Sequence, residues 1–174
     1  MATNLQFITS FQITSSQETT DLDNIFTTEY DVYKVIFTGF STVGTSTGNI
    51  NLRIIDDSGT VDANNVYDYT VYEIKADTSF QDNRNAGFGR IDRLMKIDQS
   101  PEVFGSILYV YNPKSSSTFT FFHWQGSGKY GGASRGFKGH AVHRVQEAIR
   151  GLRIFEANGG RPYDTGKISI YGVR

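Results

Sequence analysis

Apolar and polar residues alternate along many short stretches of this chain, which is the pattern of half-buried β-strands. Polar turns rich in Gly, Asn, Asp and Ser separate these stretches, and a βαβ order is absent. The pattern predicts an all-β fold: one antiparallel β-sandwich domain over residues 1–174, arranged like a jelly roll, with nine or ten strands. We expect strands near residues 5–14, 31–40, 50–55, 66–74, 91–97, 103–111, 116–124, 141–145, 152–155 and 167–173.

The segments between these strands carry their own expectations. Residues 15–28 and 77–89 are polar and are predicted to be long loops. The sequences Asp56-Asp57-Ser58-Gly59 and Asn158-Gly159-Gly160 predict tight turns. In the first strand, the odd-numbered residues from 5 to 13 are expected to share one face.

Residues 140–150 allow two interpretations. Val142, Val145 and Ile149 fall at helical spacing, which suits one short amphipathic helix. The bounding Gly139 and Gly151 and the surrounding strands favour strand, turn and strand instead. Both alternatives remain open from the sequence alone.

The stretch from residue 116 to 139 contains the most aromatic strand candidate and then the densest run of glycine. Six of the fourteen residues from 126 to 139 are glycine. We interpret residues 116–124 as a core strand and residues 126–139 as a flexible basic loop. The candidate protein-contact residues of this loop are Lys129, Tyr130, Arg135, Phe137 and Lys138.

Composition supports the β assignment and limits the chemistry. Aromatic residues make up 14% of the chain, with 13 Phe and 10 Tyr, and such residues favour strands. Cysteine is absent, so disulfides and thiolate chemistry are excluded. The sequence has no signal-peptide pattern and no apolar run long enough to span a membrane, so we expect a soluble protein made in the cytoplasm.

The net charge of −1 is unevenly distributed. Residues 1–128 contain eight basic and fifteen acidic residues, a charge of −7, whereas residues 129–174 contain nine basic and three acidic residues, a charge of +6. One interpretation is that strands from both parts mix in space and the charges average out. The other is a molecule with two complementary charged faces, suited to ordered association. We favour the first.

Catalytic, metal-binding and phosphate-binding motifs are absent from the sequence. His140-x-x-His143 would place both imidazoles on one face only in a helix, and on a strand they point to opposite faces. Asp56, Asp57 and Asp62 surround a turn and are interpreted as turn-forming residues rather than as paired catalytic carboxylates. We therefore expect no catalytic residues, no cofactor and no metal.

Two kinds of side chain suit binding. Five aromatic residues are possible platforms for sugar rings or nucleobases, and we favour packing in the core and in cross-strand pairs for all except Tyr130. These residues are Tyr67, Tyr69, Tyr72, Trp124 and Tyr130. Five basic residues are possible contacts for phosphates or carboxylates: Arg135, Lys138, Arg144, Arg150 and Arg153. The overall charge favours contact with protein carboxylates over nucleic acid.

The C-terminal stretch Gly166-Lys167-Ile168-Ser169-Ile170-Tyr171-Gly172 has the form G-x-I-S-I-Y-G. Together with MATNLQFI, YDVYKVIF and YVYNP earlier in the chain, it resembles small virion structural proteins of tailed phages, especially cyanophages and marine phages. The resemblance implies a non-enzymatic protein located in the virion and assembled in the host cytoplasm.

The resemblance also implies partners. Capsid decoration or cement protein and tail or neck appendage are the expected roles, with the major capsid protein or tail and neck proteins as neighbours. We expect a homo-oligomer or many copies per particle, binding through loops and edge strands, with no nucleic-acid or membrane partner. The alternative is a receptor-binding carbohydrate module of a tail fibre or neck appendage that recognises a host-surface glycan. A glycan hydrolase is the third possibility.

Overall fold

The computed structural model describes residues 4–42, 47–76, 80–98, 103–156 and 162–174. Within these ranges the chain forms twelve strands and no helix, so none of its described segments is a helix that could cross a membrane. The strands are β1 (Leu5–Ile13), β2 (Thr19–Leu22), β3 (Val32–Thr42), β4 (Gly48–Asp56), β5 (Tyr67–Lys75), β6 (Gln81–Phe88), β7 (Ile91–Ile97), β8 (Phe104–Tyr111), β9 (Thr120–Tyr130), β10 (Ala133–His143), β11 (Ile149–Glu156) and β12 (Tyr163–Val173).

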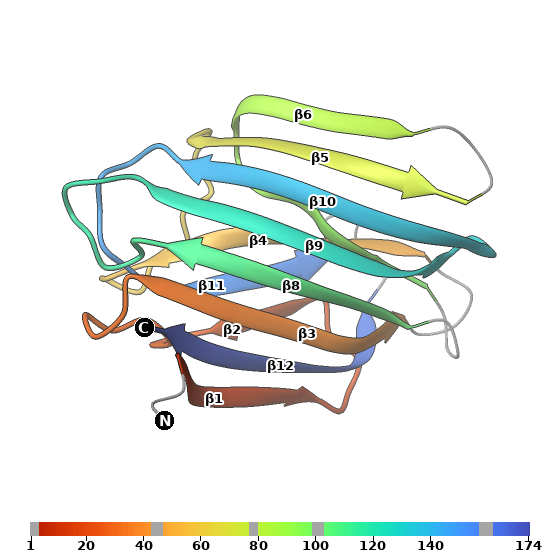
Figure 1. Ribbon diagram of the computed structural model, residues 1–174, viewed down its shortest axis with the longest axis horizontal. Helices are drawn as coiled ribbons and strands as arrows, with labels where there is room; N and C mark the ends of the chain where they lie inside the picture. The colour runs from red at the N-terminus through yellow and green to blue at the C-terminus, as the bar shows by residue number, and fades with distance from the viewer. Residues whose placement is uncertain (1–3, 43–46, 77–79, 99–102, 157–161) are drawn as a thin grey trace.

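These strands form two antiparallel sheets that pack face to face (Figure 1). The larger sheet has the order β1-β12-β3-β8-β9-β10-β5-β6, and the smaller has the order β2-β11-β4-β7. The predicted class, an antiparallel β-sandwich, is therefore confirmed, although the described residues contain more than the nine or ten strands expected.

The strand pairing is that of a jelly roll. Early strands pair with late ones in nested fashion: β1 with β12, β2 with β11, β3 with β8, and β4 with β7. The wrapping is closed by β12 with β3 and by β11 with β4. Eight strands thus reproduce the two four-stranded sheets of this topology.

The remaining four strands are two hairpins added to one side of the jelly roll. Hairpin β9–β10 continues the larger sheet beyond β8, and hairpin β5–β6 continues it beyond β10. Because β10 pairs directly with β5, the two additions meet inside one continuous sheet. The larger sheet is consequently twice as wide as the smaller one.

The core lies between the sheets and is rich in aromatic rings. Inward residues alternate with outward ones along most strands of the larger sheet, as in β8, where every second residue is buried. The largest fully buried side chains include Trp124, Tyr33, Tyr67, Tyr163, Phe37, Phe40, Phe104 and Phe122. The prediction that residues 116–124 contribute a core strand is confirmed for Phe122 and Trp124.

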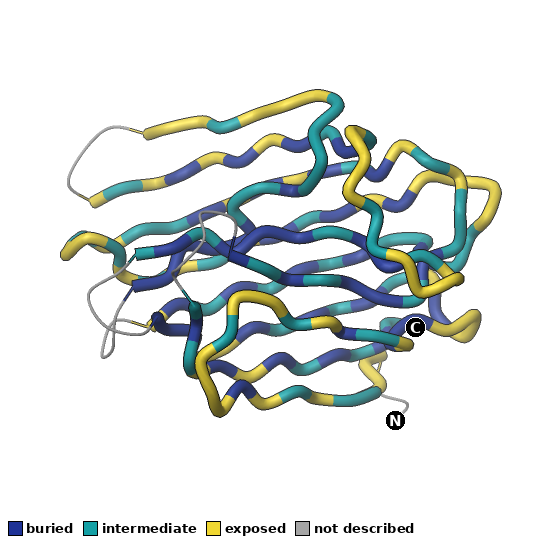
Figure 2. Tube along the Cα trace, turned by 180° about the vertical axis from the view of Figure 1, so that it is seen from behind, coloured by how far each residue is buried: buried dark blue, intermediate teal, exposed yellow. Residues whose placement is uncertain are grey.

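Two segments predicted as loops contain strands. Residues 15–28 include β2, which pairs with β11, and residues 77–89 include β6, which pairs with β5. Both are edge strands with polar sequences, so backbone pairing rather than an apolar face defines them. Seen from behind, most of β6 is exposed (Figure 2).

The single apolar face predicted for β1 is interrupted. The register with β12 shifts between Phe7, opposite Tyr171, and Thr9, opposite Ile170, which leaves Ile8 as a bulge residue. A shift of one residue reverses the alternation. Phe7 is therefore 53% exposed, whereas Ile13 is buried.

Other local predictions are confirmed. Asp56 Oδ1 accepts hydrogen bonds from Ser58 Oγ and Thr60 N at 2.6 and 2.8 Å, and Gly59 has a positive φ, as the predicted turn requires. Residues 140–150 form the end of β10, a connection and the start of β11, which excludes the helix. The turn predicted at residues 158–160 lies outside the described residues.

The glycine-rich loop predicted at residues 126–139 is wrong. These residues form the paired strands β9 and β10, joined by a two-residue turn at Gly131 and Gly132. Both glycines have positive φ, the geometry that two-residue hairpin turns need, and Asp98 Oδ2 accepts a hydrogen bond from Gly131 N at 2.6 Å. Three of the strand glycines, Gly126, Gly128 and Gly139, have the aromatic ring of Phe104 or Trp124 where a Cβ atom would stand.

Gly139 shows this role most clearly. A Cβ atom at this position would lie 2.2 Å from Cζ2 of the buried Trp124 ring on β9, which faces Gly139 in the register. Replacing Gly139 with Ala should destabilise the fold by about 1–3 kcal/mol, because the indole must leave its packed position. Urea unfolding followed by tryptophan fluorescence measures this difference.

Gly136→Ala is the matched control on the same strand. Its Cβ would meet its nearest neighbour at 3.8 Å, an ordinary contact. The control should therefore unfold at the same urea concentration as the original protein. Equal loss of stability in both variants would contradict the packing role of Gly139.

Candidate functional site

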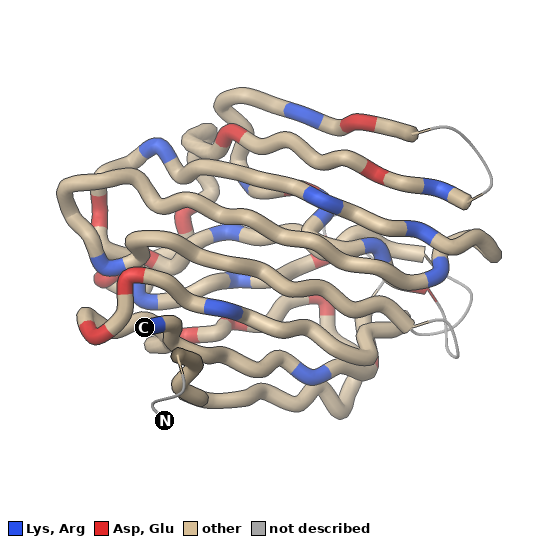
Figure 3. The backbone as a smooth tube through the Cα atoms, in the orientation of Figure 1, with Lys and Arg blue, Asp and Glu red and all other residues tan. Residues whose placement is uncertain are grey.

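The outward surface of the larger sheet is the best candidate for a functional surface. We call the outward side chains of β3, β8, β9, β10 and β5 the outer sheet face. Strand β8 contains no charged residue and β9 contains only Lys129, at its end (Figure 3). The exposed or half-exposed apolar residues of this face include Ile36, Ile107, Tyr109, Tyr111, Phe121, Tyr72 and Ile74.

A hollow of about 550 Å³ crosses the outer sheet face. Its floor follows one row of the register, in which Ser127 has Gly105 on one side and Gly136 on the other. Because these three adjacent positions carry almost no side chain, the sheet surface is open there. Ile74 comes next to Gly136 in the same row and forms one wall of the hollow.

A smaller hollow of about 250 Å³ adjoins the first, and Lys138 lines both. His123 and His140 stand directly opposite one another on β9 and β10 and line the smaller hollow. Tyr72 lines it as well, and its ring stacks on Phe80 with the ring centroids 5.3 Å apart. This hollow combines an exposed aromatic ring with several hydrogen-bonding groups.

The chemistry of the two hollows suits binding. Apolar walls from Ile36, Ile107 and Ile74 offer surface that gains free energy when it leaves water. Gln125 and Lys138 add hydrogen-bond donors at the rim. Among the described residues, neither hollow is lined by a carboxylate. An apolar centre with a polar rim is the usual composition of a contact surface.

A buried ionic network lies beneath the far end of the outer sheet face. Both carboxylate oxygens of Glu73 accept hydrogen bonds from Lys96 Nζ at 3.0 Å, and Arg135 Nη1 donates to Glu73 Oε1 at 3.1 Å. Glu73 is 1% exposed. Burial lowers the pKa of the Lys96 ammonium group, although Glu73 opposes the shift. The network fastens β5 and β10 to β7 of the smaller sheet.

The five predicted contact residues do not form one surface. Lys138 and Lys129 are exposed, and Lys138 lines both hollows. Phe137 is buried against Phe104, Arg135 pairs with Glu73, and the half-buried Tyr130 ring lies under Lys96 Nζ at 4.6 Å. Of the five, Lys129 and Lys138 are outward residues of the outer sheet face, and Lys138 is the one that lines both hollows. These residues differ because they alternate between the two faces of a hairpin, which the loop interpretation could not represent.

The candidate aromatic residues also differ in how far they are buried. Tyr67, Tyr69 and Trp124 are buried, as the core interpretation predicts. Tyr72 is 46% exposed and its ring stacks on Phe80, so of the two predicted roles this residue has the aromatic pair and not the place in the core. The signal was present in the sequence, because alternation places Tyr72 on the same face as Thr70 and opposite to Tyr69.

The structure also shows what the aspartates around the predicted turn and the two histidines of His140-x-x-His143 contact. Asp57 forms an ion pair with Lys114, whereas Asp62 lies beside His143 at 2.9 Å. The hydroxyl of Ser58 lowers the pKa of Asp56, whose carboxylate belongs to its own turn. His140 is exposed and His143 is fully buried, so the two histidines point to opposite faces as expected for a strand.

Comparison with known proteins adds little to this description. No family model matches the chain, and no curated protein matches it. Among solved structures, the crystal structure of the infectious bursal disease virus VP2 subviral particle is similar at 13% identity and a TM-score of 0.12. The comparison covers 97% of this chain and 40% of that chain. At this TM-score the likeness supports no argument about fold or function.

Replacing Glu73 with Gln tests the ionic network. The change removes the carboxylate that Lys96 and Arg135 both contact in a buried place, so the free energy of unfolding should fall by about 3–5 kcal/mol. Guanidinium unfolding measures this loss. Asp82→Asn on β6 is the control, because its ion pair with Arg84 is exposed. This control should leave stability unchanged; an equal loss would contradict the importance of the buried position.

Proposed function

We propose that this chain is a non-enzymatic structural protein of a phage virion that binds neighbouring virion proteins. The neighbours are the major capsid protein or the proteins of the tail and neck, and the protein is present in many copies or as a homo-oligomer. Its place is the virion, assembled in the host cytoplasm, without nucleic-acid or membrane contacts. Capsid decoration or cement is the role we favour over a surface appendage.

The observation that carries the proposal is the outer sheet face. Solvent-exposed faces of antiparallel sheets normally carry polar residues, with the apolar face turned to the core. Here Ile74 is 49% exposed and Phe121 is 41% exposed. Exposed apolar side chains gathered on one face mark interaction sites. We therefore assign the contact to this face as a whole, to which the glycine-rich segment contributes parts of β9 and β10.

The jelly-roll topology and the phage-like C-terminus support the proposal in different ways. Jelly rolls build both viral capsid proteins and lectins, so the topology suits a virion protein without choosing between assembly and glycan binding. The phage-like motif forms most of β12, where Ile168 and Ile170 are buried. Its residues are therefore a feature of the core strand, and they leave the contact surface to other parts of the chain.

The experiment compares incorporation of variants into phage particles. Ile74→Lys combined with Phe121→Lys should reduce the copies per particle at least about tenfold, because assembly would bury two unpaired charges. Quantitative mass spectrometry of purified particles measures the copy number, and imaging of labelled protein shows whether it lies on the head or the tail.

Phe7→Lys on β1 is the matched control. Phe7 is 53% exposed, and β1 lies four strands from β9, a distance of about 19 Å by strand spacing. This variant should be incorporated normally. Normal incorporation of the double variant, with its fold retained by circular dichroism, would contradict the assignment of the contact to the outer sheet face.

A second candidate function is recognition of a host-surface glycan, as a receptor-binding module of a tail fibre or neck appendage. The smaller hollow favours it, because the exposed ring of Tyr72 lies beside Lys138, His123 and His140. Sugar rings pack their apolar faces on aromatic rings while neighbouring polar groups bind the hydroxyls.

A glycan array tests this candidate. Binding should occur with the original protein and fall at least about tenfold with Tyr72→Ala, since the ring supplies most of the apolar contact. Tyr171→Ala, which removes a partly exposed tyrosine from β12, is the control and should bind normally. Absence of any glycan signal, together with normal particle assembly, would exclude glycan recognition.

A further inference from the structure

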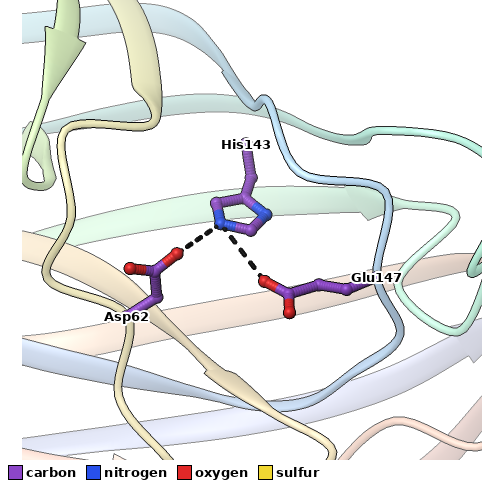
Figure 4. A group of neighbouring side chains, drawn as sticks. All are labelled: Asp62, His143 and Glu147. Atoms are coloured by element: carbon purple, nitrogen blue, oxygen red, sulfur yellow. Dashed lines mark hydrogen bonds and ion pairs between the residues drawn. The ribbon is translucent and has the colours of Figure 1, made fainter.

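Three side chains that can each act as a metal ligand lie together at one end of the sandwich, away from the outer sheet face. His143 is the last residue of β10, Asp62 lies between β4 and β5, and Glu147 lies between β10 and β11 (Figure 4). His143 Nε2 is 2.9 Å from Asp62 Oδ2 and 3.6 Å from Glu147 Oε1. Within the described ranges, this is the one group of three such residues whose ligand atoms all lie within 4.8 Å of one another.

The surrounding structure fixes Asp62 and His143 in place. Asp62 Oδ1 accepts hydrogen bonds from Asn64 N and Asn64 Nδ2, both at 2.8 Å, so Oδ2 remains directed at the imidazole. The Tyr67 hydroxyl donates to the backbone oxygen of Asp62 at 2.9 Å. The Tyr67 ring also packs beside His143, with the ring centroids 5.1 Å apart. The His143 side chain is fully buried.

The cluster carries an excess of negative charge. Two carboxylates face one imidazole, so the group is negative even when the imidazole is protonated. Arg53 lies within electrostatic range of Asp62. However, no Lys or Arg of the described residues forms an ion pair with Asp62 or Glu147.

We propose that Asp62, His143 and Glu147 bind a divalent metal ion, for which Zn²⁺ is the best chemical match. One imidazole nitrogen and two carboxylate oxygens are ordinary zinc ligands, and water would complete a tetrahedron. Ligand atoms at zinc bond lengths stand about 3.4 Å apart in a tetrahedron. The two separations from His143 Nε2, 2.9 and 3.6 Å, bracket that value, and the oxygens of Asp62 and Glu147 lie within 4.8 Å of each other.

The other imidazole nitrogen limits the affinity. His143 Nδ1 is buried and has no hydrogen-bond partner among the described residues. With Nε2 on the metal, Nδ1 carries the proton and has no acceptor for it. Missing partners of this kind lower metal affinity by about 10–100-fold. We therefore expect binding weaker than that of a fully supported structural zinc site.

The position of the site gives the ion a structural role. Asp62 belongs to the connection that leads into hairpin β5–β6, and His143 ends hairpin β9–β10. Glu147 belongs to the connection that returns the chain to the smaller sheet. A bound ion would therefore fasten both added hairpins to the connection that enters the jelly roll.

Isothermal titration of the full chain, after treatment with EDTA and removal of the chelator, tests the proposal. Zn²⁺ should bind with one equivalent per chain and raise the thermal midpoint. Ca²⁺ and Mg²⁺ should bind more weakly, because they prefer more oxygen ligands. Glu147→Gln should weaken Zn²⁺ binding at least about tenfold. Asp62→Asn removes a second ligand but alters a hydrogen-bonded residue and can prevent folding. Glu147 is partly exposed, so Glu147→Gln should fold and keeps the proposal testable in that case.

His140→Gln is the matched control. His140 faces His123 on the outer sheet face, where a pair of histidines could also attract Zn²⁺. This control should keep the affinity of the original protein. The proposal is overturned if no saturable binding occurs, if Glu147→Gln binds as tightly as the original protein, or if His140→Gln abolishes binding.

Discussion

An eight-stranded sheet faces a four-stranded one in this protein, and much of the structure depends on that mismatch. The smaller sheet ends at β7, so the inward surface of β10 and β5 needs other partners. Glu73, Lys96 and Arg135 occupy part of that surface as a buried ionic network, and His143 occupies another part beside Asp62. Buried charge of this kind is tolerated only when it is paired and hydrogen-bonded.

The same mismatch affects the outer surface. The added hairpins turn the four-strand face of a jelly roll into a broad, continuous surface. The row formed by Gly105, Ser127 and Gly136 crosses the boundary between β8, which belongs to the jelly roll, and hairpin β9–β10. The larger hollow therefore exists because the hairpins extend the sheet, and the contact surface we propose depends on this extension rather than on the basic jelly roll.

The sequence was sufficient for the fold class and for strands with a clear alternation of apolar and polar residues. Strand β7, residues 91–97, was predicted with its observed bounds. Strands β2 and β6 were missed because they lie at sheet edges, where backbone pairing alone can define a strand. The glycine-rich hairpin was missed because glycine in a strand gives no local sign of the ring that packs over it. The rings belong to Trp124, on β9 of the same hairpin, and to Phe104, on the neighbouring strand β8.

The candidate site was less accessible from sequence. Alternation correctly separates Tyr72 from Tyr69, but only the register places Tyr72 beside Lys138 and His140 beside His123. In the cluster of Asp62, His143 and Glu147, Asp62 and His143 are hydrogen-bonded although they lie 81 positions apart in the sequence. No local sequence motif therefore predicts the cluster. Sites of this kind follow from topology, which a single sequence leaves open.

The nested pairing also explains the uneven charge of the two parts of the chain. Acidic residues of the first part pair with basic residues of the last: Asp21 with Arg153 and Asp23 with Arg150, both at 2.6 Å. The interpretation that the charges mix in space is therefore confirmed. This arrangement has a consequence for biosynthesis. Strands β1 and β3 have β12 between them, so the larger sheet cannot close until residues 163–173 have left the ribosome. Residues 129–162 add seven basic and two acidic residues before that point, so the charge of the nascent chain has already changed from −7 to −2, and little self-repulsion remains to keep it soluble while its edges are unpaired.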